Sequence, residues 1–267
     1  MNGGTLHSIG KEDIDAIIDF IKGVVKDTGC KGIVVGASGG LDSAVTTKLC
    51  ADAIGPRNVL SLFMPSSVTS QADRILTEDL SRKWGTAYEA ICIQPAVDAF
   101  TKMLLSDNRM PLEMGNITAR CRMTALYNRA KKADLLVAGT TNRSEYMMGY
   151  FTKFGDGSAD FVPIIDLYKT QVWQAAEIIG VPREIIEKVP SAGLWEGQTD
   201  EDEMGITYCA LDVILDGITF GRHDSGIAED AGVEISKVME IKGRVSAMAH
   251  KRAPPYRPDI SFNKPLC

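Results

Sequence analysis

The N-terminal half of the chain alternates between two hydrophobic patterns. Residues 11–28 carry isoleucine and valine at helix spacing, so they predict an amphipathic helix that ends just before Gly29. Residues 32–35 form a short apolar run with adjacent β-branched side chains, which is typical of a buried strand. The alternation continues with predicted strands at 59–63, near 88–93 and at 135–137, and with predicted helices over about 43–54, 70–84 and 116–132.

Strands that alternate with helices indicate an α/β fold: a Rossmann-like parallel sheet flanked by helices on both faces. Beyond residue 165 the pattern becomes mainly helical, with predicted helices over about 168–180, 200–217 and 233–249. Residues 217–233 carry no motif that we can interpret, and the proline-rich tail over about 253–267 is expected to be extended. One domain over 1–267 with a helical C-terminal part is the simplest account.

Composition narrows the class of protein. The 267 residues are 45% hydrophobic and 24% charged, with a formal net charge of −6. There is no lysine and arginine excess to bind nucleic acid, no apolar run long enough to cross a membrane, and no apolar leader at the start. The six cysteines are scattered without metal spacing, as expected for free thiols of a reducing cytoplasm.

The sharpest local feature is the glycine-rich segment 36–43 between the first strand and the next helix. Successive glycines let backbone N–H groups approach an anion, and the start of a helix adds a positive dipole end. Ser38 and Ser43 offer hydroxyl groups. An acid inside a phosphate loop is repulsive unless a cation lies between them, so Asp42 suggests Mg²⁺.

The loop matches neither a Walker motif nor the dinucleotide G-x-G-x-x-G fingerprint. Its S-G-G-x-D-S string is the signature of ATP pyrophosphatases, which split ATP into AMP and pyrophosphate. The alternative is a tight turn that merely needs glycines.

Five further strings lie in the second half of the chain. They are Asn-Ile-Thr-Ala-Arg at 116–120, Gly-Thr-Thr-Asn-Arg-Ser-Glu at 139–145, Gly-Tyr-Phe-Thr-Lys-Phe-Gly-Asp-Gly at 149–157, Pro-Ser-Ala-Gly-Leu-Trp-Glu-Gly-Gln-Thr-Asp-Glu at 190–201 and His-Lys-Arg at 250–252. With the loop they closely resemble the NAD synthetase family, from about residue 11 to 258 and in the family's order.

The resemblance implies an activity in two steps. The carboxylate of deamido-NAD (nicotinic acid adenine dinucleotide) attacks the α-phosphate of ATP and releases pyrophosphate, and ammonia then displaces AMP to give NAD. The family implies Mg²⁺, ATP as co-substrate and a homodimer, with the helices 116–132 and 200–217 as candidate contacts. Met123, Leu126, Ile206 and Leu211 on these helices could equally be internal core. Only about 35 residues precede the loop, so the chain resembles the ammonia-dependent type, and a separate glutaminase partner stays open.

The resemblance also assigns residues. For ATP they are Gly36, Ala37, Ser38, Gly39, Gly40, Leu41, Asp42, Ser43, Thr140, Lys169 and Ser191; for Mg²⁺, Asp42 and Glu145; for the dinucleotide, Arg120, Lys153, Asp160, His250 and Lys251. Lys169 is expected to neutralise the α-phosphate, and Asp156 is expected to position or deprotonate the incoming nitrogen. Taken singly, Lys169 and Arg120 could be solvated helix residues, and Asp156 could be part of an Asp-Gly turn.

Two rival functions remain at this stage. Another ATP pyrophosphatase, such as a tRNA-modifying or sulfur-inserting enzyme, would typically need a basic surface or paired cysteines. A non-catalytic nucleotide-binding module would not need Asp42 and Glu145 together with Lys169 and Arg120.

Overall fold

The computed structural model describes residues 6–104, 110–191, 193, 197 and 199–257. Its strands are β1 (Gly32–Ala37), β2 (Val59–Phe63), β3 (Ala87–Ala90) and β4 (Leu135–Ala138). Its longer helices are α1 (Lys11–Thr28), α2 (Leu41–Ile54), α3 (Gln71–Trp84), α4 (Gln94–Leu104), α5 (Pro111–Ala133), α7 (Lys169–Ile178), α10 (Tyr208–Thr219), α11 (Asp224–Ala231) and α12 (Ile235–Ala247). Shorter helices are η1 (Pro56–Asn58), α6 (Arg143–Met148), α8 (Arg183–Ile186), α9 (Asp200–Met204) and α13 (Ala249–Arg252).

Within the described residues, the four strands form one parallel sheet in the order β3-β2-β1-β4. Ile33 of β1 lies opposite Val59 on one side and Leu136 on the other. The chain therefore places β2 and β3 on one side of β1, and β4 on the other. Open parallel sheets bind ligands at the carboxyl ends of the strands where the order reverses. In this sheet that point lies between β1 and β4.

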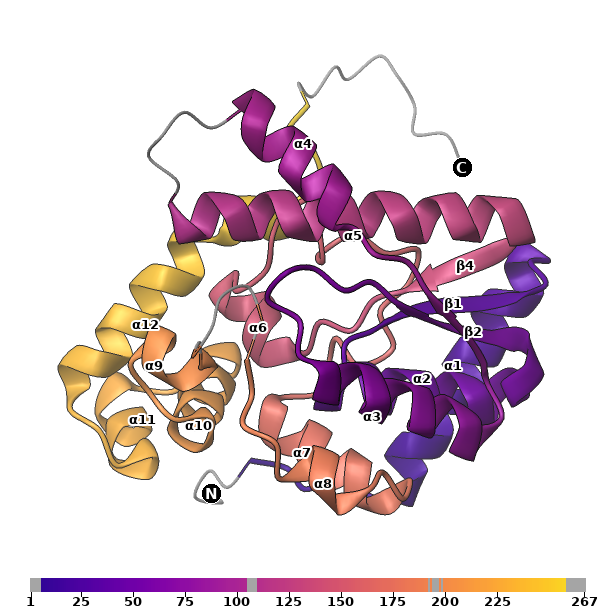
Figure 1. Cartoon of the computed structure of the whole chain (residues 1–267). Helices are drawn as coiled ribbons and strands as arrows, with labels where there is room; N and C mark the ends of the chain where they lie inside the picture. The colour runs from indigo at the N-terminus through magenta and orange to yellow at the C-terminus, as the bar shows by residue number, and fades with distance from the viewer. Residues whose placement is uncertain (1–5, 105–109, 192, 194–196, 198, 258–267) are drawn as a thin grey trace, which may run out of the picture.

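Both faces of the sheet are covered by helices, which confirms the predicted fold class. Ile33 and Val35 belong to a buried cluster with α1, α2 and α7, whereas Val34 belongs to a second cluster with α4 and α5. Figure 1 shows the long α5 lying across one side of the strands and α2 and α3 on the other. A strand buried on both faces needs apolar residues at every position, which explains the continuous run at 32–35.

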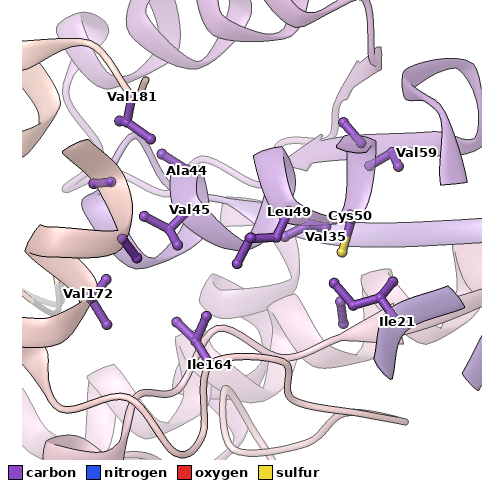
Figure 2. Close-up of a cluster of buried hydrophobic side chains, with 14 of the residues drawn as sticks. Ile21, Val35, Ala44, Val45, Leu49, Cys50, Val59, Ile164, Val172 and Val181 are labelled. Atoms are coloured by element: carbon purple, nitrogen blue, oxygen red, sulfur yellow. The ribbon is translucent and has the colours of Figure 1, made fainter. Parts of the chain in front are cut away.

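Helix α2 packs deep in the first cluster. Figure 2 shows its Val45, Leu49 and Cys50 near Val35, Ile21, Val172 and Ile164. Leu49 and Cys50 are fully buried, and burial raises the pKa of the Cys50 thiol so that it stays neutral. The cysteines at positions 30, 50, 92, 121 and 209 are all free, as predicted, while position 267 lies outside the described residues. The packing of α2 fixes the loop in front of it.

The C-terminal helices have a buried cluster of their own. Tyr208, Leu211 and Ile214 of α10 pack with α11 and α12, and Met148 of α6 joins them. Figure 1 shows these helices gathered at one end of the molecule. The sequence left open whether Leu211 contacts a second subunit or belongs to the internal core. Leu211 is fully buried inside this cluster, so it belongs to the core.

The structure corrects the predicted helix over 200–217. It is two helices, α9 and α10, because Gly205 adopts a left-handed conformation (φ 64°) and the Thr207 side chain caps a new start by accepting from the Ala210 N–H. The uninterpreted stretch 217–233 contains α11. Strand β3 ends at Ala90, but Ile91 N–H and Ile93 N–H continue in the same direction by donating to the carbonyls of Phe63 (2.9 Å) and Pro65 (3.0 Å).

Two predictions concern the tail and membranes. Residues 254–257 are not helical, as expected, and the rest of the predicted extended tail, 258–267, lies outside the described residues. Over the described part of the chain, no helix has the length and apolar character needed to span a bilayer.

Candidate active site

The glycine loop lies at the carboxyl end of β1, as predicted, and its serines hold it in shape. Ser43 Oγ donates to the Gly40 carbonyl at 3.0 Å and accepts from Ser38 N–H at 3.2 Å. Ser38 Oγ accepts from Gly40 N–H at 3.2 Å. These bonds fold the loop tightly over the start of α2, so the first N–H groups of that helix face the strand ends.

Gly39 has a backbone that only glycine adopts easily, with φ at 74°. A Cβ there would also lie 3.2 Å from both Cα and O of Asp73, at the start of α3. Lys188 Nζ donates to the Gly39 carbonyl at 3.0 Å and pairs with the Asp73 carboxylate. Sequence reasoning missed Lys188, which precedes the Pro-Ser-Ala-Gly string but lies outside the quoted motif.

Asp42 and Lys169 form an ion pair at the reversal point of the sheet. Asp42 is the second residue of α2, and Lys169 is the first residue of α7. Asn142, in the segment after β4, donates from Nδ2 to Asp42 Oδ1 at 3.0 Å. The Lys169 side chain is 3% exposed, so its ammonium depends on these neighbours rather than on water.

Glu145 lies beside this pair in α6. Asn142 and Glu145 form a capping box: Glu145 N–H donates to Asn142 Oδ1 at 2.9 Å, and Asn142 N–H donates to Glu145 Oε2 at 3.2 Å. Burial raises the pKa of Glu145 well above its ordinary value, and the Asp42 carboxylate raises it further. Burial acts to lower the pKa of Lys169, but Asp42 and Glu145 outweigh it and hold that pKa above its ordinary value. A cation bound in addition to the Lys169 ammonium would relieve the repulsion between the Asp42 and Glu145 carboxylates.

One cleft of about 1090 Å³ joins the loop to the second half of the chain. It contains most of the residues that the sequence assigned to a site. Its lining includes Gly36, Ala37, Ser38, Gly40, Leu41, Asp42, Ser43, Arg120, Thr140, Glu145, Lys153, Asp156, Lys169, Ser191, His250 and Lys251. Gly39 and Asp160 are not among the described residues that line it.

The far wall of the cleft is built from segments distant in sequence. Lys153 Nζ donates to the His250 carbonyl at 2.7 Å. Lys251 Nζ donates to the carbonyls of Gly149 (2.7 Å) and Phe151 (2.8 Å), and Arg120 donates to the Lys153 carbonyl at 3.3 Å. These hydrogen bonds tie α13 to the segment 149–157, so a group of cations gathers at this wall.

The two aspartates of the glycine-rich segment have different surroundings. Asp156 faces the cleft and accepts from Thr152 N–H at 2.9 Å. Its residue surface is exposed, yet protein atoms crowd the carboxyl group and raise its pKa, while Thr152 and Arg122 act in the opposite direction. Asp160 instead accepts from Val137 N–H at 2.7 Å, which holds residue 160 against the end of β4. In this structure Asp160 has a structural hydrogen bond.

An acidic group that sequence reasoning did not assign lies near Lys169. Asp200 is buried in the cleft wall and accepts from the Tyr208 hydroxyl at 3.0 Å. Tyr150 donates to Glu203, which also lines the cleft. The acidic run at 200–203 was the available signal, but a run of acids ordinarily indicates a solvated surface.

Together, the fold and the cleft define a nucleotide-binding α/β protein whose phosphate loop opens at the reversal point of a parallel sheet. Comparison with known proteins narrows this class. A family model described as NAD synthase matches residues 13–255, and the chain belongs to that family.

Three relatives illustrate the family. The chain is 43% identical over 252 residues to the NH(3)-dependent NAD(+) synthetase of Thermococcus kodakarensis, covering 92% of this chain and 96% of that protein. A solved NMN synthetase from Francisella tularensis superposes with a TM-score of 0.82 at 35% identity, covering 94% of this chain and 98% of the other. The NH3-dependent NAD synthetase of Campylobacter jejuni gives a TM-score of 0.79 at 29% identity, covering 93% and 98%.

Proposed function

We propose that this chain amidates the nicotinate carboxylate of deamido-NAD with ammonia, consuming ATP and yielding NAD, AMP and pyrophosphate. The observation that carries the proposal is that one cleft brings these residues together. Its lining includes the glycine loop with Asp42, Glu145 and Lys169, and also the cations Lys153 and Lys251. Such a cleft suits two anionic substrates that must meet. Relatives that are 43% and 44% identical to this chain are named NH(3)-dependent NAD(+) synthetase.

In the first step, an oxygen of the substrate carboxylate forms a bond to the α-phosphorus of ATP. The bond from that phosphorus to the bridging oxygen breaks, and pyrophosphate leaves with the electron pair. Negative charge accumulates on the leaving group, so donors fixed in advance lower the barrier. We assign this role to the loop N–H groups and the Lys169 ammonium, and Thr140 and Ser191 also line the cleft.

Magnesium fits the donors at this end. Asp42 and Glu145 supply hard carboxylate oxygens, and burial and mutual repulsion raise the pKa of Glu145, which a divalent cation would offset. The described residues contain no group of three or more His, Cys, Asp or Glu suited to a metal ion, so phosphate oxygens and water would complete the coordination. Bound there, the ion would neutralise phosphate charge, while Lys169 would exchange its bond with Asp42 for one with ATP.

In the second step, the nitrogen of ammonia attacks the carbonyl carbon of the acyl-adenylate. The bond from that carbon to the AMP oxygen breaks, AMP leaves with the electron pair, and the nitrogen releases a proton to water to give the neutral amide. Ammonium must first lose a proton. We assign Asp156 as the group that accepts it, and two observations support this: Asp156 lines the cleft, and the pKa of its carboxyl group is raised. Arg120, Lys153, His250 and Lys251 are proposed to hold the dinucleotide, and Asp160 supports their segment through β4.

We further propose that the chain functions as one synthetase unit and as a homodimer. Exposed apolar side chains gather at the end of α4 and the start of α5: Phe100, Met103, Leu104, Met110 and Leu112. Exposed apolar groups of this kind favour a protein contact. Sedimentation velocity should give twice the monomer mass, and Met103→Glu should shift the population toward monomer; a wild-type monomer at micromolar concentration contradicts the dimer.

The test of the activity mixes the protein with ATP, Mg²⁺, ammonium and deamido-NAD. NAD and pyrophosphate should form in equal amounts, and replacing ammonium with glutamine should stop NAD formation. Pyrophosphate that depends on added RNA would instead support a tRNA-modifying enzyme. Binding without turnover would support a nucleotide-binding module.

A second candidate substrate follows from the superposition on the NMN synthetase. That likeness favours a mononucleotide carrying the same nicotinate carboxylate. Both substrates should therefore be offered in one vessel. Preference for the dinucleotide supports the first proposal, and at least tenfold preference for the mononucleotide would replace it.

A further inference from the structure

Asp212 is a fully buried acid that has no part in the chemistry above. It lies in α10, with 0% of its surface exposed, between the apolar neighbours Leu211 and Leu215 on the same helix. Helix α10 packs against both α6 and α7. A carboxylate in such surroundings is costly unless hydrogen bonds compensate for the lost water.

The hydrogen bonds of Asp212 reach two other helices. Its Oδ1 accepts from the Ser144 hydroxyl at 2.5 Å. Its Oδ2 accepts from both the backbone N–H and the hydroxyl of Thr170, each at 2.8 Å. The Ser144 hydroxyl donates its only hydrogen to Asp212, and the same oxygen accepts a hydrogen bond from the backbone N–H of Lys169 at 2.9 Å. One carboxylate thus joins the first turn of α6 to the first turn of α7.

These two first turns carry the cleft's essential charges. Ser144 directly precedes Glu145, and Thr170 directly follows Lys169. The backbone positions of Glu145 and Lys169 therefore depend on the same hydrogen-bond network, although Asp212 does not line the cleft. A neutral, apolar residue would fill the position at lower desolvation cost, but it could not hold two helix starts together.

We propose that Asp212 is a positioning residue that sets Glu145 and Lys169 relative to each other for attack on the α-phosphate. The inference rests on the proposed function. Burial raises the pKa of Asp212 to about 6. The carboxylate is therefore ionised at neutral pH, although its buried surroundings favour the neutral acid. The positive end of α7 and the donors from Ser144 and Thr170 favour that charge.

The test compares Asp212→Asn with Asp216→Asn. Asp216 lies one turn further along α10, outside the network, and serves as the matched control. Because misplacement of reacting groups by about 1 Å can cost about 100-fold in rate, we expect Asp212→Asn to lower kcat by about 10- to 100-fold. The KM for deamido-NAD should stay within about twofold of wild type, because its contacts lie on other elements, and the melting temperature at pH 7 should not fall below that of Asp216→Asn.

Two results would overturn the inference. One is a folded Asp212→Asn variant with a kcat within about twofold of wild type. The other is a kcat loss accompanied by a matching rise in the KM for deamido-NAD and a lower melting temperature, which would indicate a general structural role. A wild-type protein that makes no NAD would instead refute the proposed function, and the two failures are therefore distinguishable.

A second pair of variants decides the question if Asp212→Asn does not fold. Thr170→Ala removes both the methyl group and the hydroxyl that donates to Asp212, whereas Thr170→Ser removes the methyl group alone, so the two variants differ only by the hydroxyl contact. We expect kcat to fall about fivefold in Thr170→Ala, because one of the three hydrogen bonds that Asp212 accepts from Ser144 and Thr170 is lost, and to stay near wild type in Thr170→Ser. Equal kcat values in the two variants would overturn the inference.

Discussion

At the residue scale, Lys169 shows how this cleft tolerates a buried charge. The side chain is almost completely enclosed, and burial alone would lower its pKa. The carboxylates of Asp42 and Glu145 reverse that effect, so the ammonium persists. Each of these three groups therefore depends on the others for its charge.

The first prediction follows from this dependence. Lys169→Met leaves two carboxylates facing each other without a cation, so the free energy of unfolding should fall by about 3 kcal/mol, the usual cost of breaking a buried pair. The double variant Asp42→Asn with Lys169→Met should recover part of that loss. Urea denaturation at pH 7 measures all three proteins. A loss below about 1 kcal/mol would contradict the coupling.

A second prediction concerns the pH dependence of stability. Burial raises the pKa of Asp212 from 3.8 to about 6 in the folded state, so the folded protein binds a proton that the unfolded chain releases between these values. The corresponding stability is fully present below about pH 4 and is lost as pH rises through about 6, a change of about 3 kcal/mol. The free energy of unfolding of wild type minus that of Asp212→Asn should decrease accordingly from pH 4 to pH 7. A difference that does not vary with pH would show that the Asp212 pKa is not raised.

Asp156 allows the two chemical steps to be separated. Asparagine in its place cannot accept a proton from ammonium, but it leaves the loop and Lys169 unchanged. Asp156→Asn should therefore slow NAD formation while ATP–pyrophosphate exchange, which reports adenylation, continues. Equal loss of both rates would remove the proposed role for Asp156.

At the scale of elements, local sequence signals predict the fold well where they agree with packing. The helix over 11–28 was predicted with the bounds that the structure gives α1, because its apolar spacing and Gly29 mark both its face and its end. The break between α9 and α10 was missed because residues on both sides continue a helical hydrophobic pattern. The helix is interrupted only by the left-handed backbone conformation of Gly205 and by the Thr207 side chain, which caps the start of α10.

The site divides in the same way. Motif strings identified many of the polar residues that line the cleft, since each string carries its own chemistry. Lys188 and Asp212 were not found, because their importance comes from contacts with residues 149 and 68 positions away in sequence, such as Gly39 and Ser144. No local pattern records such a contact.

Gly149 provides a prediction at this scale. It ends α6 with φ at 63°, and a Cβ there would lie 2.5 Å from Met248 Cβ, just ahead of α13. Gly29 is the matched control, because it ends α1 with φ at 70° and has open space around it. Both substitutions to alanine cost about 1 kcal/mol of backbone strain, but only Gly149→Ala should displace His250 and Lys251.

Steady-state kinetics tests this contrast. Gly149→Ala should raise the KM for deamido-NAD several-fold more than the KM for ATP, while Gly29→Ala should leave both KM values near wild type. If the two variants behave alike, the close contact with Met248 does not position α13.

At the scale of the whole molecule, charge is distributed unevenly. The chain carries a net charge of −6, yet Arg120, Lys153, Lys169 and Lys251 line one cleft. The net negative charge repels anionic substrates at long range, and the cations of the cleft attract them at short range.

Salt should therefore act on binding rather than on the chemical steps. At 0.5 M KCl the Debye length falls to about 4 Å, which screens the exposed cations of the cleft. The KM values for ATP and deamido-NAD should rise several-fold between 0.05 and 0.5 M KCl, with kcat changing less than twofold and sucrose serving as the uncharged control. KM values insensitive to salt would indicate that uncharged contacts dominate binding.

The bonds from Lys251 to the Gly149 and Phe151 carbonyls have a consequence for biosynthesis. Lys251 leaves the ribosome 102 residues after Gly149, so the segment around Phe151 emerges long before the side chain that satisfies its carbonyls. The sheet and its phosphate loop can fold during translation, since domains form as the chain emerges. The wall proposed to hold the dinucleotide cannot form until Lys251 has emerged. A nascent chain should therefore form its phosphate loop well before it can bind the dinucleotide.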